Sequence, residues 1–237
     1  GGFEHKKHKD INKQFKNVSD INSIKIIENN PTNSIKAANV MIDFTTPQST
    51  LENVKIASQN KTAVIIGTTG MTESQKKKVK SYAKKIPILM SSNMSIGVNL
   101  LFNLVRQTAH ALKDTDYDIE IAETHHKHKK DAPSGTALSL GEYAAEGRKI
   151  SFNKSKVLDR TKKLTNRKKG DIGFSVTRGG EIAGEHTVSF IGENDRVDLF
   201  HKANNRSIFV RGAIDAAIFL SNKKSGFYSM SDLLFSK

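Results

Sequence analysis

Residues 62–75 read Thr-Ala-Val-Ile-Ile-Gly-Thr-Thr-Gly-Met-Thr-Glu-Ser-Gln, an apolar run followed by a glycine turn and the start of a helix. The run 62–66 is almost wholly apolar, which is typical of a strand buried on both faces. Thr72 and Gln75 have the spacing of a capping box, so we expect a helix from there to about residue 85. The stretch therefore predicts one strand–turn–helix unit.

The same alternation continues on both sides of this unit. Residues 40–44 form an apolar run, and Pro47 suits the first turn of a helix that extends to residue 60. Residues 87–91 form a third run. Strands and helices at this spacing predict an α/β fold with a Rossmann-like parallel sheet. The strand tails should meet at the carboxyl edge, where such sheets bind ligands. These tails are residues 45–46, 67–69 and 92–93.

The pattern changes beyond residue 93. Residues 96–112 predict a long amphipathic helix, and a strand and a further helix at about 134–146 follow. Strand-like runs separated by turn residues then predict an α+β unit on a mostly antiparallel or mixed sheet. The lysine-rich residues 159–170 are its most loop-like part. The runs are 157–158, 173–177, 185–191 and 196–201, and a final helix spans 207–220.

Composition narrows the class of protein. The 237 residues carry a net charge of +14, but the basic residues are scattered, tryptophan is absent and aromatic residues do not accompany them. We therefore do not expect nucleic-acid binding as the main role. There is no cysteine, so disulfides and thiolate chemistry are excluded. Residues 1–16 lack the apolar centre of a secretion signal and no run is long enough for a membrane helix, so we expect a cytoplasmic protein.

A second stretch concentrates the chemistry. Residues 123–136 read Glu-Thr-His-His-Lys-His-Lys-Lys-Asp-Ala-Pro-Ser-Gly-Thr, between a strand and a helix. Proton donors thus gather beside a helix N-terminus, whose free N–H groups and dipole favour anions. The stretch predicts a site that holds and protonates a small acidic substrate, although a solvated basic loop is the plain alternative.

The histidines and one lysine of this stretch lead to two further expectations. Adjacent His125 and His126 at a strand end should project to opposite sides, which argues against both reaching one metal ion, so we expect no metal site. For His128 and Lys130 we expect a solvated surface.

This stretch closely resembles the signature of the 4-hydroxy-tetrahydrodipicolinate reductase (dihydrodipicolinate reductase) family, Glu-x-His-His-x-x-Lys-x-Asp-Ala-Pro-Ser-Gly-Thr-Ala, matched through Ala137. Further resemblances follow in family order over nearly the whole chain. The resemblance implies NADH- or NADPH-dependent reduction of a small dicarboxylate, 4-hydroxy-tetrahydrodipicolinate, to tetrahydrodipicolinate in the diaminopimelate route to lysine. The other matching segments are 43–45, 67–70, 93–99, 184–187, 201–203, Arg206, 212–213 and 226–230.

The resemblance also implies residue roles. His125 and Lys129 correspond to the residues implicated in proton delivery. His126, Gly135 and Thr136 correspond to the residues that hold the substrate. Glu4 fits the acidic residue that binds the adenosine ribose, with residues 5–7 beside it for a 2′-phosphate. The other positions that match cofactor contacts are Gly67, Thr68, Thr69, Ser91, Ser92, Asn93 and Met94.

Domain organisation and assembly follow from the same resemblance. It implies a nucleotide-binding domain of residues 1–95 and 207–237 and a substrate and tetramerisation domain of residues 96–206. We expect a homotetramer joined through the second sheet. Phe174, Val176, Val188 and Phe190 could cover such a joint sheet, but packing inside one subunit explains them equally well.

One departure from the family concerns the first residues. The family opens with a strand and a Gly-x-x-Gly-Arg-Met-Gly phosphate loop, and this sequence contains neither. We therefore expect these 237 residues alone to bind the reduced cofactor poorly, and a segment of about thirty further N-terminal residues to restore binding. The departure also leaves an alternative function, a catalytically impaired relative that acts as a basic binding or scaffold protein.

Overall fold

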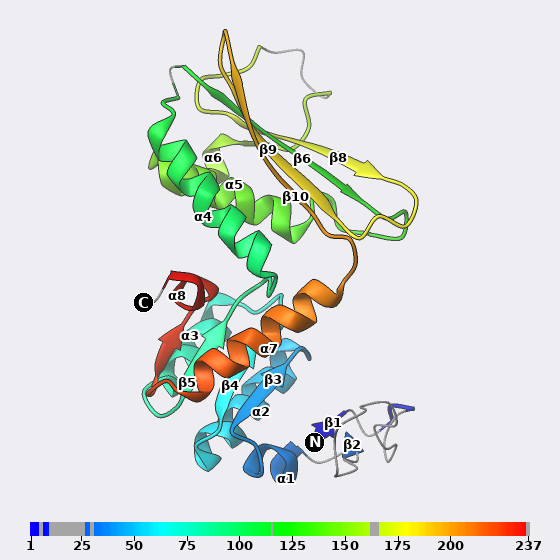
Figure 1. The fold of residues 1–237 in the computed structure, drawn as a ribbon, viewed down its shortest axis with the longest axis vertical. Coiled ribbons are helices and arrows are strands. Elements are labelled where there is room, and N and C mark those ends of the chain that lie inside the picture. The colour runs from blue at the N-terminus through cyan, green and yellow to red at the C-terminus, as the bar shows by residue number, and fades with distance from the viewer. Residues whose placement is uncertain (5–6, 10–26, 29–30, 115, 162–165, 236–237) are drawn as a thin grey trace. The chain divides into compact units, whose positions relative to one another are not determined.

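The computed structural model describes residues 1–4, 7–9, 27–28, 31–114, 116–161 and 166–235. These divide into two compact units, Gly1–Ser91 with Ala213–Leu233, and Ser92–Gly212 with the residues from Leu234 onward. Figure 1 shows the course of the chain through both units. Among the described residues, no helix combines the length and apolar character needed to cross a membrane.

The first unit is built on a four-stranded parallel sheet in the order β11-β5-β4-β3. Its strands are β3 (Val40–Asp43), β4 (Ala63–Ile66), β5 (Pro87–Met90) and β11 (Gly226–Tyr228). All four residues of β4 are buried, as expected for a strand covered on both faces. The three apolar runs predicted from the sequence are therefore strands of one parallel sheet, which confirms the α/β fold.

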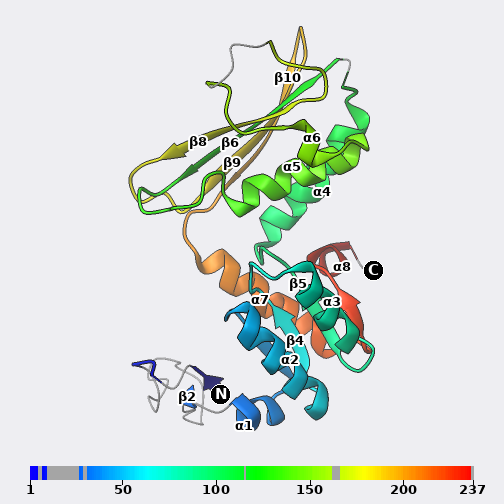
Figure 2. The same ribbon diagram turned by 180° about the vertical axis from the view of Figure 1, so that it is seen from behind.

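Helices cover both faces of this sheet. The part of α7 (Ser207–Ser221) that belongs to this unit lies in front of the strands in Figure 1, and α2 and α3 lie in front of them in the reverse view of Figure 2. Helix α2 (Pro47–Asn60) starts at the predicted proline, and α3 (Glu73–Tyr82) starts with the predicted capping box of Thr72 and Gln75. Helix α1 (Pro31–Lys36) and most of α8 (Met230–Phe235) also belong to this unit.

A separate pair of very short strands lies near the start of the chain. β1 (Gly2–Phe3) pairs in parallel with β2 (Ile27–Glu28). Phe3 packs against the core between the sheet and α2, which includes Met41, Val54 and Val64.

The second unit holds a five-stranded mixed sheet in the order β10-β9-β6-β8-β7. β6 pairs antiparallel with β9, and β9 with β10, whereas the β6–β8 and β8–β7 pairs are parallel. This arrangement confirms the mixed sheet predicted from the sequence. Its strands are β6 (Asp118–His125), β7 (Lys156–Val157), β8 (Ile172–Arg178), β9 (Glu185–Ile191) and β10 (Arg196–Lys202).

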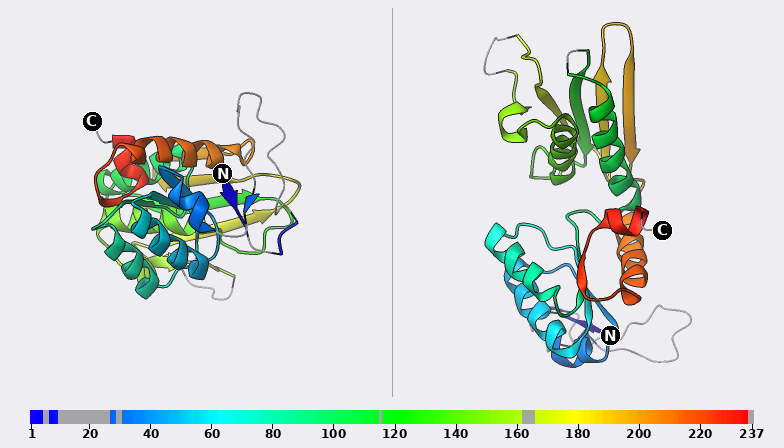
Figure 3. Two further views of the ribbon diagram at one scale, coloured as in Figure 1. Left: turned by 90° about the horizontal axis from the view of Figure 1, so that it is seen from below. Right: turned by 90° about the vertical axis from the view of Figure 1, so that its left-hand side faces the viewer.

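Two long helices, α4 (Ile96–Ala111) and α5 (Gly135–Arg148), pack against each other and against one face of this sheet (Figure 3). The short α6 (Phe152–Ser155) follows them. Val188 and Phe190 are fully buried in this core and Phe174 packs against it, so these three side chains lie on the helix-covered face. Of the two alternatives for these side chains, the structure therefore supports packing inside one subunit. Val176 lies two positions after Phe174, on the same face.

Candidate active site

The core face of the second sheet becomes polar at the carboxyl end of β6. The buried positions of this strand are two isoleucines and then Glu123 and His125. The sheet register sets His186 of β9 opposite Glu123 and Arg178 of β8 opposite His125. Because every second residue of a strand points to the same face, these ionisable side chains share the face that the helices cover.

The Glu123 carboxylate is the centre of this cluster, and its side chain is fully buried. One oxygen accepts hydrogen bonds from the backbone N–H of Ser134 at 2.8 Å and from Arg178 Nη2 at 2.9 Å. The other oxygen accepts from Nδ1 of His125. Burial alone would raise the pKa of Glu123, but the hydrogen bonds from Arg178 and Ser134 outweigh it and hold the pKa below its ordinary value.

His125 and His186 are both buried, with their rings edge to face and their centroids 5.1 Å apart. Burial lowers the pKa of His125, and the charge of Glu123 opposes that effect. Burial and the neighbouring His125 lower the pKa of His186 from 6.5 to about 4. Near neutral pH His186 is therefore a neutral ring, which shares a hydrogen bond of 3.1 Å with the hydroxyl of Ser134.

Lys129 lies on the loop that follows β6 and is largely shielded, with 21% of its side chain exposed. Its ammonium group forms an ion pair of 2.9 Å with Asp131, whose pKa is lowered chiefly by that hydrogen bond. The backbone N–H of Gly135, the first residue of α5, adds to the same effect on Asp131. The predicted proton donor Lys129 and the predicted substrate residue Gly135 are thus connected through one carboxylate.

The N-terminus of α5 supplies the predicted substrate-binding turn. Ser134 caps the helix by accepting a hydrogen bond from the N–H of Ala137 at 3.1 Å. Gly135 is exposed, and a Cβ atom built there would meet nothing within 4 Å. The hydroxyl oxygen of Thr136 accepts from Asn93 Nδ2 at 3.1 Å, which leaves the O–H of Thr136 able to donate to a ligand.

His126 differs from its neighbour His125 in its surroundings. Its ring lies 6.2 Å from that of His128 and is half-buried, whereas the ring of His125 lies against His186. The separate surroundings agree with the expectation that the two adjacent histidines do not converge. His128 and Lys130 are exposed, as expected for surface residues.

Three ligand-type atoms of Glu123, His125 and His186 lie within 4.8 Å of one another, the spacing of a possible metal site. Both oxygens of Glu123 already accept hydrogen bonds, one of them from the cationic Arg178. A metal ion would have to replace these bonds beside a guanidinium group. The cluster therefore fits a hydrogen-bond network better than a metal centre.

The carboxyl edge of the first sheet carries the predicted cofactor loop. Asp43, at the end of β3, is only 1% exposed. Its carboxylate accepts from the N–H of Thr45 at 2.9 Å, from the Thr45 hydroxyl at 2.6 Å and from Asn53 Nδ2 at 3.0 Å. The hydroxyls of Thr50 and Thr68 lie at 3.3 Å from the same carboxylate. Asp43 thereby joins the ends of β3 and β4 to α2, and the strand tails 45–46 and 67–69 meet at one edge as predicted.

The residues expected to contact the cofactor differ in their exposure and in whether the side chain or the backbone is available to a ligand. The Thr68 hydroxyl is bound by Asp43, Thr45 and Thr50, so this buried residue offers its backbone rather than its side chain. Thr69 and Ser92 are exposed, and Gly67 and Ser91 are half-buried. Asn93 and Met94 are buried, at 9% and 1% exposure. Phe44 covers Gly67 closely, since a Cβ built there would lie 2.1 Å from the phenyl ring.

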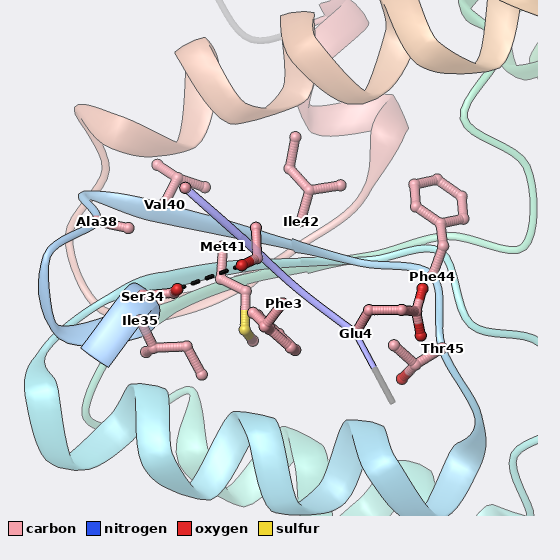
Figure 4. A pocket seen from close by; sticks show the side chains of 12 residues that line it. Phe3, Glu4, Ser34, Ile35, Ala38, Val40, Met41, Ile42, Phe44 and Thr45 are labelled. Carbon is pink, nitrogen blue, oxygen red and sulfur yellow. Dashed lines mark hydrogen bonds between the residues drawn. The ribbon is translucent and has the colours of Figure 1, made fainter. Parts of the chain in front are cut away.

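Glu4 lies in a pocket of about 390 Å³ between the first residues, α1 and β3. Figure 4 shows its carboxylate beside Thr45, near the carboxyl end of β3, with Phe44 close by. The predicted ribose-binding residue Glu4 thus lies close to the carboxyl end of β3, though not in the four-stranded sheet itself. His5 and Lys6, the predicted 2′-phosphate contacts, lie outside the described residues, whereas Lys7 is described and exposed.

Fold and site together indicate the class of protein, an α/β oxidoreductase with one unit suited to a nicotinamide nucleotide and another suited to a small substrate. Sequence comparison then gives the family. The N-terminal domain model of dihydrodipicolinate reductase matches residues 1–94, and the C-terminal domain model matches residues 97–234. The chain belongs to the dihydrodipicolinate reductase family.

Individual relatives agree with this assignment. A 4-hydroxy-tetrahydrodipicolinate reductase of Caulobacter vibrioides is 50% identical over 204 residues, covering 85% of this chain and 79% of that protein. The enzyme of the same name from Zymomonas mobilis is 47% identical over 199 residues, covering 84% and 78%.

Solved structures also resemble this one. The dipicolinate-bound dihydrodipicolinate reductase of Paenisporosarcina sp. TG-14 has a TM-score of 0.69 at 27% identity, covering 86% of this chain and 77% of that one. A probable dehydrogenase of Thermotoga maritima has a TM-score of 0.53 at 10% identity, covering 87% and 78%, which shows likeness of fold alone.

The sequence did not single out three residues that the structure places in the cluster, Glu123, Arg178 and His186. A signal existed for Glu123, because it follows two isoleucines at alternate positions of β6 and so had to be a buried carboxylate. His186 lies in a segment that resembles the family, yet nothing local gives it a role. Arg178 had no signal, since its place beside Glu123 depends on a parallel strand pairing across 55 residues.

Proposed function

We propose that this chain reduces 4-hydroxy-tetrahydrodipicolinate to tetrahydrodipicolinate with NADH or NADPH, in the diaminopimelate route of lysine biosynthesis. The observation that carries the proposal is a set of donor groups gathered at one strand end: the shielded side chains of Lys129 and His125, beside the N-terminal turn of α5. Relatives that are 47–50% identical to this chain over about 200 aligned residues bear the name of that reductase. The solved relative bound to dipicolinate supports a pyridine dicarboxylate as the class of ligand.

The reaction replaces a ring hydroxyl by hydrogen. Loss of water leaves a conjugated imine, which accepts a hydride and is left with negative charge on its carbon–nitrogen system, and a proton completes the product. We assign proton delivery to His125 and Lys129, because a nearby imidazolium or ammonium both stabilises that charge and supplies the proton.

Substrate binding falls to His126, Gly135 and Thr136. Gly135 is exposed, and its N–H lies at the positive end of the α5 dipole, where a carboxylate is favoured. The O–H of Thr136 adds a directional donor, and His126 adds a ring that can donate from the loop. Asp131 already accepts from Lys129 and Gly135, so the substrate carboxylate would compete with it for the same donors.

The residues at the carboxyl edge of the first sheet fit a nicotinamide nucleotide. The 67–69 loop leaves a parallel strand for a helix and is fixed by Asp43, and the Glu4 carboxylate suits a ribose hydroxyl. We assign cofactor binding to Glu4, to the backbone of Gly67, Thr68 and Thr69, and to Ser91, Ser92, Asn93 and Met94. When bound, the reduced nicotinamide supplies the hydride.

The proposed function also includes an oligomeric state and a cellular location. We propose a cytoplasmic homotetramer joined through the face of the second sheet that its helices leave open, where Ala122 and Phe200 are exposed. Multi-angle light scattering at micromolar concentration should give four times the subunit mass of 26.2 kDa. A monomer at that concentration would remove this part of the proposal.

A coupled assay tests the activity. The upstream synthase generates the unstable substrate in place, and the loss of reduced-cofactor absorbance is followed. Turnover that requires both the synthase and this protein is expected. Absence of turnover from a folded protein, combined with tight, salt-dependent binding to a polyanion, would favour a non-catalytic binding protein instead.

A further inference from the structure

We infer that the Glu123–Arg178 ion pair is a positioning element: Glu123 fixes the tautomer and orientation of His125, and Arg178 ties it to the loop that carries Lys129. The inference rests on the proposed function, since it concerns how the two proposed proton donors are held. Neither residue is assigned any contact with the substrate.

Glu123 is in direct hydrogen-bonding contact with His125. The carboxylate can only accept at neutral pH, so Nδ1 of His125 carries the hydrogen of their hydrogen bond. In the neutral ring the lone pair is then on Nε2, the nitrogen that Glu123 does not engage. A carboxylate on Nδ1 also stabilises the imidazolium, as in carboxylate–histidine pairs of unrelated enzymes.

The Glu123 carboxylate is itself fixed in position by hydrogen bonds from other residues. Its side chain is fully buried, and Ser134 N–H and Arg178 Nη2 bind the oxygen that His125 does not use. With both oxygens engaged by three donors, the carboxylate has little freedom to rotate. The imidazole of His125 is therefore held in one plane. Gly184 permits this position, because a Cβ built there would lie 2.9 Å from Nε2 of the ring.

Arg178 forms hydrogen bonds with two segments at once, the end of β6 and the loop that follows it. Its Nη2 donates to Glu123 at 2.9 Å and to the backbone carbonyl of Asp131 at 2.7 Å, and Nη1 donates to the carbonyl of Thr177 at 2.8 Å. Asp131 in turn pairs with Lys129 at 2.9 Å. One guanidinium group thus fixes the strand end that carries His125 and the loop that carries Lys129.

The charged and titratable groups around His125 decide the direction of its pH dependence. They are Glu123 on β6, Arg178 on β8 and Lys129 on the loop, together with His186 on β9, whose ring contacts that of His125. Burial lowers the pKa of His125, Lys129 and Arg178 lower it further, and Glu123 alone among these raises it. Loss of the Glu123 charge should therefore lower the pKa of His125.

Glu123→Gln is the decisive variant, because the amide keeps the shape but can donate to Nδ1. The matched control is Glu146→Gln, which removes the carboxylate of an exposed 3.1 Å pair with Arg106 between α4 and α5. In the coupled assay we expect Glu123→Gln to lower kcat by about 10²-fold or more with little change in KM. We also expect the alkaline limb of kcat to move to lower pH, because a proton donor is lost as the pH rises above its pKa. The control should change neither.

A second measurement does not depend on turnover. Nitrogen-15 NMR of histidine-labelled full-length protein reports the tautomer of His125, whose signal is identified by its loss in His125→Gln. We expect the Nδ1–H tautomer in the wild type and a mixed or Nε2–H ring in Glu123→Gln. Arg178→Lys keeps the charge but cannot bridge the same two acceptors, so we expect a smaller fall in kcat with the tautomer retained.

The outcomes separate the inference from the proposed function. An Nε2–H ring in the folded wild type, or an unchanged tautomer and pH profile in folded Glu123→Gln, would overturn the positioning role whatever the activity. An active wild type with those results would leave the reductase function standing. An inactive wild type with the expected tautomers would overturn the function but support the Glu123 contact.

Discussion

The side-chain amide of Asn93 donates a hydrogen bond of 3.1 Å to the hydroxyl oxygen of Thr136, joining the residues before α4 to the first turn of α5. The side chain of Asn93 is itself fixed, because its amide oxygen Oδ1 accepts a hydrogen bond from the N–H of Ser95 at 2.8 Å. A residue expected to contact the cofactor thus orients a residue expected to contact the substrate.

This relationship makes the Thr136 hydroxyl a directed donor. Thr136→Val should raise the substrate KM about 10-fold or more, since a hydrogen bond to a charged group is worth about 1.5–3 kcal/mol, while kcat changes little. Thr136→Ser keeps the hydroxyl and should stay near the wild type. Steady-state kinetics in the coupled assay measure both, and an equal KM for the valine and serine variants would argue against the contact.

The proposed proton donors should affect a different constant. His125→Ala and Lys129→Ala should each lower kcat by about 10²–10⁴-fold, because proton delivery matters in the transition state more than in binding. His128→Ala is the matched control, since 69% of that side chain is exposed on the same loop. Full turnover by the double variant of His125 and Lys129 would remove both residues from the mechanism.

Much of this architecture could be predicted because its signals are local. A proline at the first turn of α2 and a capping box at α3 determine where those helices start, and the apolar runs of β3, β4 and β5 needed no distant partner to be recognised. The stretch 123–136 likewise carries its histidines, lysines and helix cap within a few residues.

The rest depended on contacts between distant residues. The cluster of Glu123, Arg178 and His186 exists only because β8 and β9 flank β6 in a particular register. The side of the sheet on which Val188 and Phe190 lie also depends on that register, since a shift of one residue reverses every side chain. The carboxylate of Asp131 lies beside Lys129 because of the conformation of their loop, and the composition of the loop does not determine that conformation.

The buried carboxylate of Asp43 should be important for both stability and cofactor affinity. Asp43→Ala would leave the Thr45 N–H, the Asn53 amide and the nearby hydroxyls without their acceptor, at a cost of roughly 2–4 kcal/mol. The 67–69 loop would lose an anchor, so the KM for reduced cofactor should also rise. Glu52→Ala, a loss of an exposed carboxylate on α2, is the control. Urea denaturation and cofactor titration of kinetics give the two values.

Close packing of α4 against α5 should make Gly147 sensitive to any side chain. A Cβ built there would lie 2.2 Å from the backbone carbonyl oxygen of Arg106, so the two helices must separate to accept it. Gly147→Ala should cost about 1–3 kcal/mol or more in unfolding free energy. Gly179→Ala is the control, because nothing lies within 4 Å of that position. Similar denaturation midpoints for the two variants would contradict the packing described.

His186 should make the stability depend on pH between mild acid and neutrality. The pKa of His186 falls from 6.5 to about 4 in the folded chain, so below about pH 6.5 the unfolded chain binds a proton that the folded chain does not. Stability is therefore complete above about pH 6.5, decreases as the pH falls toward 4, and changes no further from this group below that. The whole effect is roughly 3 kcal/mol, of which roughly 2 kcal/mol should be lost between about pH 7.5 and pH 5. The lowered pKa values of His125 and His201 act in the same direction. Urea denaturation at those two pH values tests the expectation, with His186→Gln as the variant that cannot titrate there. The variant should show a clearly smaller difference between the two pH values, and an equal difference in both proteins would show that His186 is not held neutral by the fold.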